Sequence, residues 1–177
     1  ELGKASVIQI SRASPSFTHT LTYAFGSATG TIVSKTASTS VTWNPQLSLA
    51  NQIPKAVTGT CTITCTTYNG STNIGSKTCT LTLSVPASIK PSITSLTAAR
   101  VDGEVPSAWG IYVQTKSKAT LKINGASGNY RSSITAYSIT GGGYTSTASS
   151  FTTGFLNAEG TITFSAVVTD SRGRTSD

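Results

Sequence analysis

The sequence predicts an all-β protein made of two tandem immunoglobulin-like antiparallel β-sandwich domains, at residues 1–87 and 88–177. Three observations support this prediction. Apolar and polar residues alternate with a period of two along most of the chain, and turn signals recur about every 8–12 residues. The stretch PASIKP at residues 86–91 is a linker by composition, and each half fits an immunoglobulin-like unit of about 100 residues.

The first half contains four short stretches with this alternation, and each predicts a strand: residues 5–11, 17–25, 31–35 and 39–43. In the second stretch one face carries Phe17, His19, Leu21, Tyr23 and Phe25. Trp43 shares its parity with Val41, so we expect it in the core. Residues 47–52, before Pro54, predict a short helical turn.

Residues 58–85 form the clearest element of the sequence. The first arm has Cys61, Ile63 and Cys65 on one face and threonines on the other. The second arm repeats this pattern with Cys79, Leu81, Leu83 and Val85. The pattern is typical of an antiparallel hairpin with one buried face.

The register of this hairpin depends on the length of its loop. A two-residue turn at Asn69-Gly70 would expose Cys79, unless a bulge corrects the slip. A three-residue loop would set Cys61 opposite Cys79 but leave Gly75 inside a strand. We expect a longer loop over residues 69–75, which sets Cys65 opposite Cys79.

Three cysteines are an odd number for a disulfide framework. Either all three are small apolar side chains in a reduced core, or Cys65 and Cys79 form a cross-strand disulfide and Cys61 stays free. A closed zinc site needs four ligands, and the lone His19 is distant in sequence. We therefore expect no metal site and no cofactor.

The second half repeats the pattern of short strands and turns. The predicted strands are residues 93–101, 108–116, 119–124, 130–140, 144–153 and 161–169. Within 108–116 the inward residues would be Trp109, Ile111 and Val113, and within 119–124 they would be Leu121 and Ile123. The loops and turns between them would lie at residues 102–107, 124–129, 141–143, 157–160 and 170–173.

Charge and composition exclude several function classes. The chain has 13 basic and 6 acidic residues, a net charge of +7 spread over both halves. No basic run interleaves with aromatic residues, so we expect no nucleic-acid binding. No apolar run reaches about 18 residues, so we expect no membrane insertion. Because the chain has no methionine and no signal-peptide pattern, we expect it to be a piece of a longer polypeptide.

No pattern of residues indicates a reaction. His19 lies on the inward face of its strand, which favours a core or interface residue over a catalytic base. Asp102 and Glu104 lie two residues apart in one loop, whereas glycoside hydrolysis needs carboxyl groups opposed across a cleft. We therefore expect no catalytic residues and no enzyme activity.

Two groups of residues are candidates for a ligand surface. Exposed tyrosine rings would stack on sugars, and the candidates are Tyr112, Tyr130, Tyr137 and Tyr144. Arg172 and Arg174 would hold an anionic polymer, such as a cell-wall teichoic acid. The alternative is that Asp170 fixes a turn with these arginines, with Gly173 at a positive φ.

Four segments resemble the repeated domains of minor structural and tail proteins of siphophages that infect Gram-positive bacteria, and of related prophages. They are PSFTHTLTYAFGSATGTI, TSVTWNP, GTCTITCTTYNGSTNIGSKTCTLTLSVP and VTDSRGRTSD, which span both halves. The resemblance implies a virion location, a role in tail or tail-fibre structure and host attachment, and other tail proteins as partners. It implies no catalytic residues.

Three hypotheses follow for the function. The favoured one is a phage tail module that acts as a spacer and contributes to host adhesion, with host cell-wall polysaccharide as a partner. The second is a carbohydrate-binding module, which an exposed row of aromatic residues would favour. The third is an extracellular stalk of a bacterial surface protein, which an oxidised Cys65–Cys79 pair would favour. Edge strands would also allow homo-oligomers.

Overall fold

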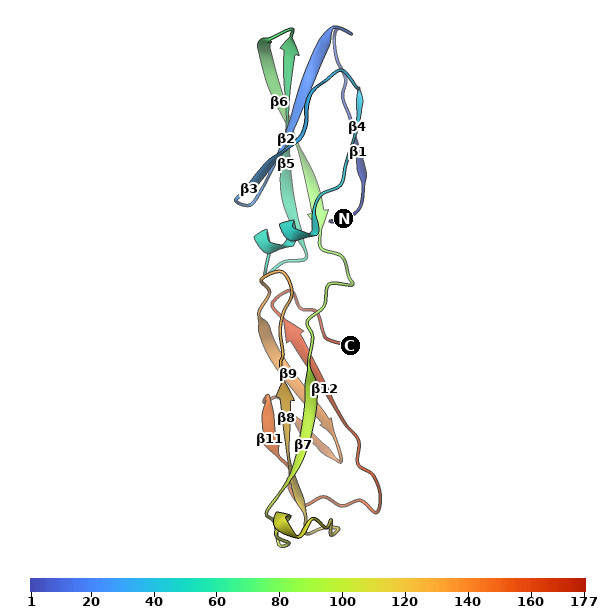
Figure 1. Cartoon of the computed structure of the whole chain (residues 1–177), viewed down its shortest axis with the longest axis vertical. Helices are drawn as coiled ribbons and strands as arrows, with labels where there is room; N and C mark the ends of the chain where they lie inside the picture. Colours follow the sequence, from blue (N-terminus) through green and yellow to red (C-terminus); the bar gives the residue numbers. More distant parts are fainter. The chain divides into compact units, whose positions relative to one another are not determined.

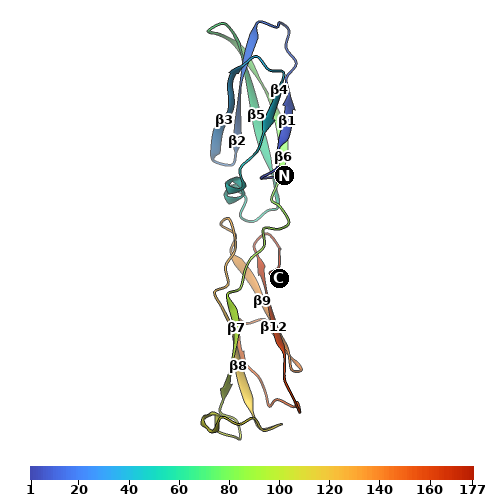
Figure 2. The same cartoon turned by 45° about the vertical axis from the view of Figure 1, so that its right-hand side comes forward.

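The computed structural model describes residues 1–177 and is all-β, with antiparallel pairing in all four sheets (Figures 1 and 2). The chain divides into two compact units, Glu1–Ile89 (unit 1) and Lys90–Asp177 (unit 2). The division falls inside the PASIKP stretch. The structure has two 3-10 helices and no helix with the length and apolarity needed to cross a membrane.

Unit 1 contains a two-stranded sheet, β1-β4, and a four-stranded sheet in the order β3-β2-β5-β6. The predicted strand at 17–25 and the helical turn at 47–52 are confirmed, because β2 and η1 have these bounds. The elements are β1 (Ser6–Gln9), β2 (Phe17–Phe25), β3 (Ala28–Thr36), β4 (Ser40–Trp43), η1 (Leu47–Gln52), β5 (Thr58–Asn69) and β6 (Thr72–Ser84).

Both sheets of unit 1 contribute to one core, because strands that alternate apolar and polar residues place one set of side chains inward. Tyr23 of β2 contacts Trp43 of β4, with ring centroids 5.2 Å apart, and so joins the sheets. Trp43 is buried, as the sequence predicts. The other buried side chains from these strands are His19, Leu21, Phe25, Val41, Cys61, Ile63 and Leu83.

The predicted register of the β5–β6 hairpin is wrong. The turn is a tight one at Gly70-Ser71, and Ile74 is an extra residue between the pairs Tyr68–Asn73 and Thr67–Gly75. This bulge shifts the register, and Gly75 takes a φ of 139° that glycine adopts without strain.

Beyond the bulge, Cys65 faces Lys77 and Cys79 faces Ile63, so the expected Cys65–Cys79 pair is not formed. All three cysteines are free, and Cys79 is exposed on the edge strand β6.

Unit 2 contains two three-stranded sheets, β10-β9-β12 and β11-β8-β7. Its core joins them, because Leu121 and Ile123 of β8 pack with Ile139 of β9 and Val168 of β12. The elements are β7 (Ser95–Val101), η2 (Ser107–Trp109), β8 (Lys118–Asn124), β9 (Ile134–Gly141), β10 (Tyr144–Ser146), β11 (Ser150–Thr152) and β12 (Phe164–Asp170).

Two predicted strands of unit 2 are wrong. Residues 108–116 form no strand: η2 ends at Trp109, Gly110 caps it with a φ of 67°, and Trp109 and Ile111 are exposed, not inward. The backbone there bonds to local and distant loop groups, so the alternating pattern has no neighbouring strand. Residues 144–153 divide into β10 and β11, which belong to different sheets.

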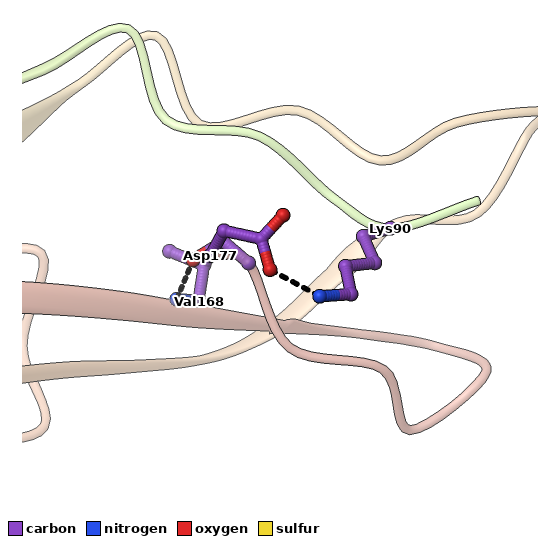
Figure 3. Close-up of polar contacts among 4 residues, drawn as sticks. Lys90, Val168 and Asp177 are labelled. Carbon is purple, nitrogen blue, oxygen red and sulfur yellow. Dashed lines mark hydrogen bonds and ion pairs between the residues drawn. The ribbon is translucent and has the colours of Figure 1, made fainter. Parts of the chain in front are cut away.

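The first and last residues of unit 2 meet. The Lys90 ammonium group forms an ion pair with the Asp177 carboxylate (Figure 3). Ser176 Oγ accepts a hydrogen bond from the Val168 N–H at 3.1 Å, which fixes the last residues against β12. The segment between β7 and β8 lies at the opposite end of unit 2 (Figure 1).

Candidate functional site

Unit 2 exposes a group of large apolar side chains at the end that is remote from Lys90 and Asp177. They are Trp109, Ile111, Tyr112 and Phe155, with exposed fractions of 66%, 52%, 41% and 38%. The first three lie between β7 and β8, and Phe155 follows β11. We call these four residues the aromatic end. Exposed apolar groups of this kind mark interaction sites when they gather on one surface.

Hydrogen bonds brace the two segments of the aromatic end. Asp102 Oδ1 accepts from Ser107 Oγ at 2.7 Å and from the Ser107 N–H at 2.8 Å. Both bonds lower the pKa of Asp102 below its ordinary value, and the bond from the Ser107 hydroxyl has the larger effect. Tyr112 accepts at its hydroxyl from the Ala158 N–H at 3.1 Å, and Thr115 N–H donates to the Leu156 carbonyl at 2.8 Å. The segment before β8 is therefore tied to the segment after β11.

The predicted tyrosines do not form a single surface. Tyr112 belongs to the aromatic end, and Tyr144 is half-buried and donates from its hydroxyl to the Phe155 carbonyl at 2.9 Å, so it supports the same end. Tyr137 is packed against the core of unit 2. Tyr130 is half-buried at a φ of 48°, and its carbonyl accepts from Arg172. The alternating pattern predicted that Trp109 and Ile111 lie in the core, so it did not predict their exposure.

The position of Arg172 does not fit the predicted binding of an anionic polymer at the protein surface. It is buried, and its guanidinium donates at 2.8 Å to the carbonyls of Asn129 and Tyr130. Burial lowers the pKa of Arg172, the charge of Asp170 opposes this change, and Arg174 adds to it. The side chain therefore joins two turns that are distant in sequence.

The predicted turn after β12 is confirmed. Asp170 is 2% exposed, and its Oδ1 accepts from the N–H groups of Arg172 at 2.9 Å and Arg174 at 3.0 Å. Gly173 has a φ of 78°, as the sequence predicts for this position. Arg174 is half-buried, and its carbonyl accepts from the Asp170 N–H at 2.9 Å.

His19 and Cys65 are the one close His–Cys pair of the structure. His19 Nδ1 lies 3.1 Å from Thr67 Oγ1 and 3.7 Å from Cys65 Sγ. Burial raises the pKa of the Cys65 thiol, although a hydrogen bond with Thr67 opposes the change. A thiol with a raised pKa is a poor nucleophile at neutral pH, because the thiolate is the reactive form. No group of three His, Cys, Asp or Glu side chains is close enough to hold a metal ion.

The three thiols are expected to differ in reactivity. Cys79 is exposed, whereas Cys61 is buried and burial raises its pKa. At pH 7 a maleimide reagent should therefore modify Cys79 at least about tenfold faster than Cys61. Mass spectrometry of the digested protein measures both rates, and unfolding in urea should make them equal. Faster labelling of Cys61 in the folded protein would contradict the burial described above.

Comparison with known proteins gives one match to a family. The family described as "Siphovirus protein of unknown function (DUF859)" matches residues 1–177 of this chain. No curated protein matches the chain. A solved structure of fibronectin(III)-like modules from Clostridium thermocellum CbhA is similar at 15% sequence identity and a TM-score of 0.33; the alignment covers 99% of this chain and 82% of that one.

Proposed function

The chain belongs to this family of siphovirus proteins, and on that premise we propose that it is a non-enzymatic structural module of the phage tail. Family membership supports a structural role associated with the virion. The raised pKa of Cys65, the thiol beside His19, supports a role without catalysis. Other tail proteins would be its partners.

The module consists, in this proposal, of two tandem immunoglobulin-like β-sandwich domains that act as a spacer. Each compact unit has two antiparallel sheets with a shared core, which supports this description. The β5–β6 ladder extends along almost the whole of both strands, from Thr58–Ser84 to Asn69–Thr72. This continuous ladder supports the description of unit 1 as a regular sheet domain.

The aromatic end carries the second part of the proposal, which is adhesion to the host cell wall. Trp109 and Tyr112 present exposed rings on a braced segment, and planar aromatic faces stack on the pyranose rings of polysaccharides. Because hydrogen bonds already hold the Tyr112 hydroxyl, little conformational entropy of this side chain is lost on binding. The net charge of +7 also favours anionic wall polymers.

Replacing Trp109 with alanine tests the adhesion proposal. We expect the variant to bind purified Gram-positive cell walls at least about tenfold more weakly than the wild type in a sedimentation assay, because an exposed Trp is a frequent hot spot. Thermal unfolding should not change, since the side chain is exposed.

Val7→Ala is the matched control, because Val7 is a 58% exposed apolar residue of unit 1. Equal binding by the wild type and both variants would contradict adhesion through the aromatic end, and absence of wall binding by the wild type would leave the spacer role alone.

A carbohydrate-binding module proper is the second candidate, and the same exposed rings favour it. It differs from the first in that the chain would bind free oligosaccharides of the wall in solution. Titration calorimetry with soluble wall fragments separates the two: saturable binding that Trp109→Ala abolishes favours the second candidate.

A further inference from the structure

Unit 1 contains a cleft that the aromatic end does not share. Its volume is about 480 Å³. One wall consists of residues 8–13, which begin within β1, and the other consists of residues 74–79 of β6. β1 pairs with β4 alone, and β6 pairs with β5 alone, so each wall strand has one unpaired edge. Near the other end of β6 the two sides meet, because the Leu2 N–H donates to the Ser84 carbonyl at 2.9 Å. The residues before β1 thus contact the end of β6 at Ser84, and the cleft lies farther along β6, at residues 74–79.

The floor of the cleft is apolar apart from Thr67 and His19. It is lined by Phe17, Leu21, Ile63, Cys65 and Thr67, and by His19. His19 is 2% exposed; its Nδ1 lies near Thr67, but its Nε2 has no hydrogen-bond partner. Buried polar atoms without a partner are rare in folded proteins. Because Nε2 has almost no exposed surface, a ligand in the cleft would contact mainly the apolar side chains of the floor.

The charged residues of the cleft are both basic. Arg12 and Lys77 line it, and no acidic residue does. Arg12 Nη1 donates to the carbonyls of Ala37 at 2.6 Å and Phe17 at 3.3 Å, so its guanidinium is held in place. Lys77 is exposed and takes no part in the ion pairs of the chain. The cleft would therefore attract carboxylates and repel basic groups.

The unpaired edge of β6 also limits what can pair with it. A lysine and a bulge on an edge strand reduce indiscriminate pairing with other strands. β6 has both, at Lys77 and at Ile74, so a partner that pairs here must offset the lysine charge.

From these features we propose that the cleft docks an extended acidic segment of another polypeptide as an added β-strand. Six residues of strand span about 20 Å, which matches the six residues of β6 that line the cleft. Alternate apolar side chains of the segment would contact the floor, and carboxylates would face Arg12 and Lys77. Within a phage tail the segment would come from a neighbouring tail protein, but the docking does not depend on the adhesion proposal.

Two labelled heptapeptides test this proposal with the full chain. One is Val-Asp-Val-Asp-Val-Asp-Val and the other has lysine in place of each aspartate. In fluorescence anisotropy at low ionic strength, we expect the acidic peptide to bind at least about tenfold more tightly than the basic one. Hydrogen exchange should show that β6 amides become protected when the acidic peptide binds.

Charge reversal provides the matched variants. Lys77→Glu should weaken binding of the acidic peptide at least about tenfold, whereas Lys55→Glu, an equal change at an exposed residue outside the cleft, should not. The proposal is overturned if neither peptide binds, if both bind equally, or if the two variants behave alike. It is also overturned if decanoate displaces the peptide and β6 amides stay unprotected, because the cleft would then hold a small amphiphilic anion instead of a strand.

Discussion

Replacing Asp170 with alanine is expected to destabilise unit 2 by about 3–5 kcal/mol and to leave unit 1 unchanged. The buried carboxylate accepts from the N–H groups of Arg172 and Arg174, and it lies beside the buried charge of Arg172. Its removal leaves two N–H groups without this acceptor and takes the negative charge of Asp170 away from the guanidinium. Since a small domain is stable by only about 5–15 kcal/mol, this is a large fraction of the total.

The measurement is a urea titration followed by NMR, with the amide signals of Val168 for unit 2 and Leu21 for unit 1. Asp102→Ala is the matched control: Asp102 also accepts from a backbone N–H and a hydroxyl, but its carboxylate is exposed. We expect the control to unfold close to the wild-type midpoint. Equal shifts in the two variants would contradict a special role for burial at Asp170.

The strands that the sequence predicts well are those with a buried face. Residues 17–25 become β2, and Leu121 and Ile123 are buried in β8 as expected. The stretch 108–116 has the same alternation, yet it forms no strand, since no neighbouring strand pairs with it. Periodicity reports which side chains share a face, but only the tertiary structure decides whether another layer covers that face.

The hairpin register shows a second limit. Alternation correctly placed the odd-numbered residues of β5, as far as Thr67, opposite odd-numbered residues of β6, but several loop lengths satisfy this condition. The signal that could have selected the true register is Gly75, because a glycine within a strand often marks a bulge. That reading would have replaced the expected Cys65–Cys79 pair with Cys65 opposite Lys77.

Only part of the candidate site could be predicted from the sequence. Asp170 and Gly173 are diagnostic of a turn, because their roles depend on neighbouring residues. The guanidinium of Arg172 instead contacts Asn129 and Tyr130, more than forty positions earlier. The exposure of Trp109 likewise depends on how distant segments pack, so no local pattern could predict it.

Replacing Phe25 with alanine is the corresponding prediction for unit 1. Phe25 is the largest of the fully buried side chains, and its ring packs over the backbone of Gly59. A Cβ added at Gly59 would lie 2.9 Å from two ring carbons of Phe25 and 3.0 Å from Ile53 Cγ2. We expect Phe25→Ala to destabilise unit 1 by about 3–5 kcal/mol, because it removes apolar contacts and leaves a cavity.

The same NMR titration measures this change, with Leu21 shifted and Val168 unchanged. Val7→Ala is the control within unit 1, since Val7 is exposed and should alter stability by less than about 0.5 kcal/mol. A parallel shift at Val168 would mean that the two units unfold together, and this would also count against two independent spacer domains.

A double substitution tests whether the contact between Phe25 and Gly59 is the cause. Gly59→Ala alone should destabilise unit 1 by about 1–3 kcal/mol, because the added methyl group overlaps the ring. With Phe25→Leu, the smaller side chain makes room for that methyl group, so the double variant should be more stable than the sum of the two single changes predicts. The expected coupling is about 0.5–3 kcal/mol. Strict additivity would mean that the ring does not pack over Gly59, and the cost of Phe25→Ala would then come from contacts with the rest of the core.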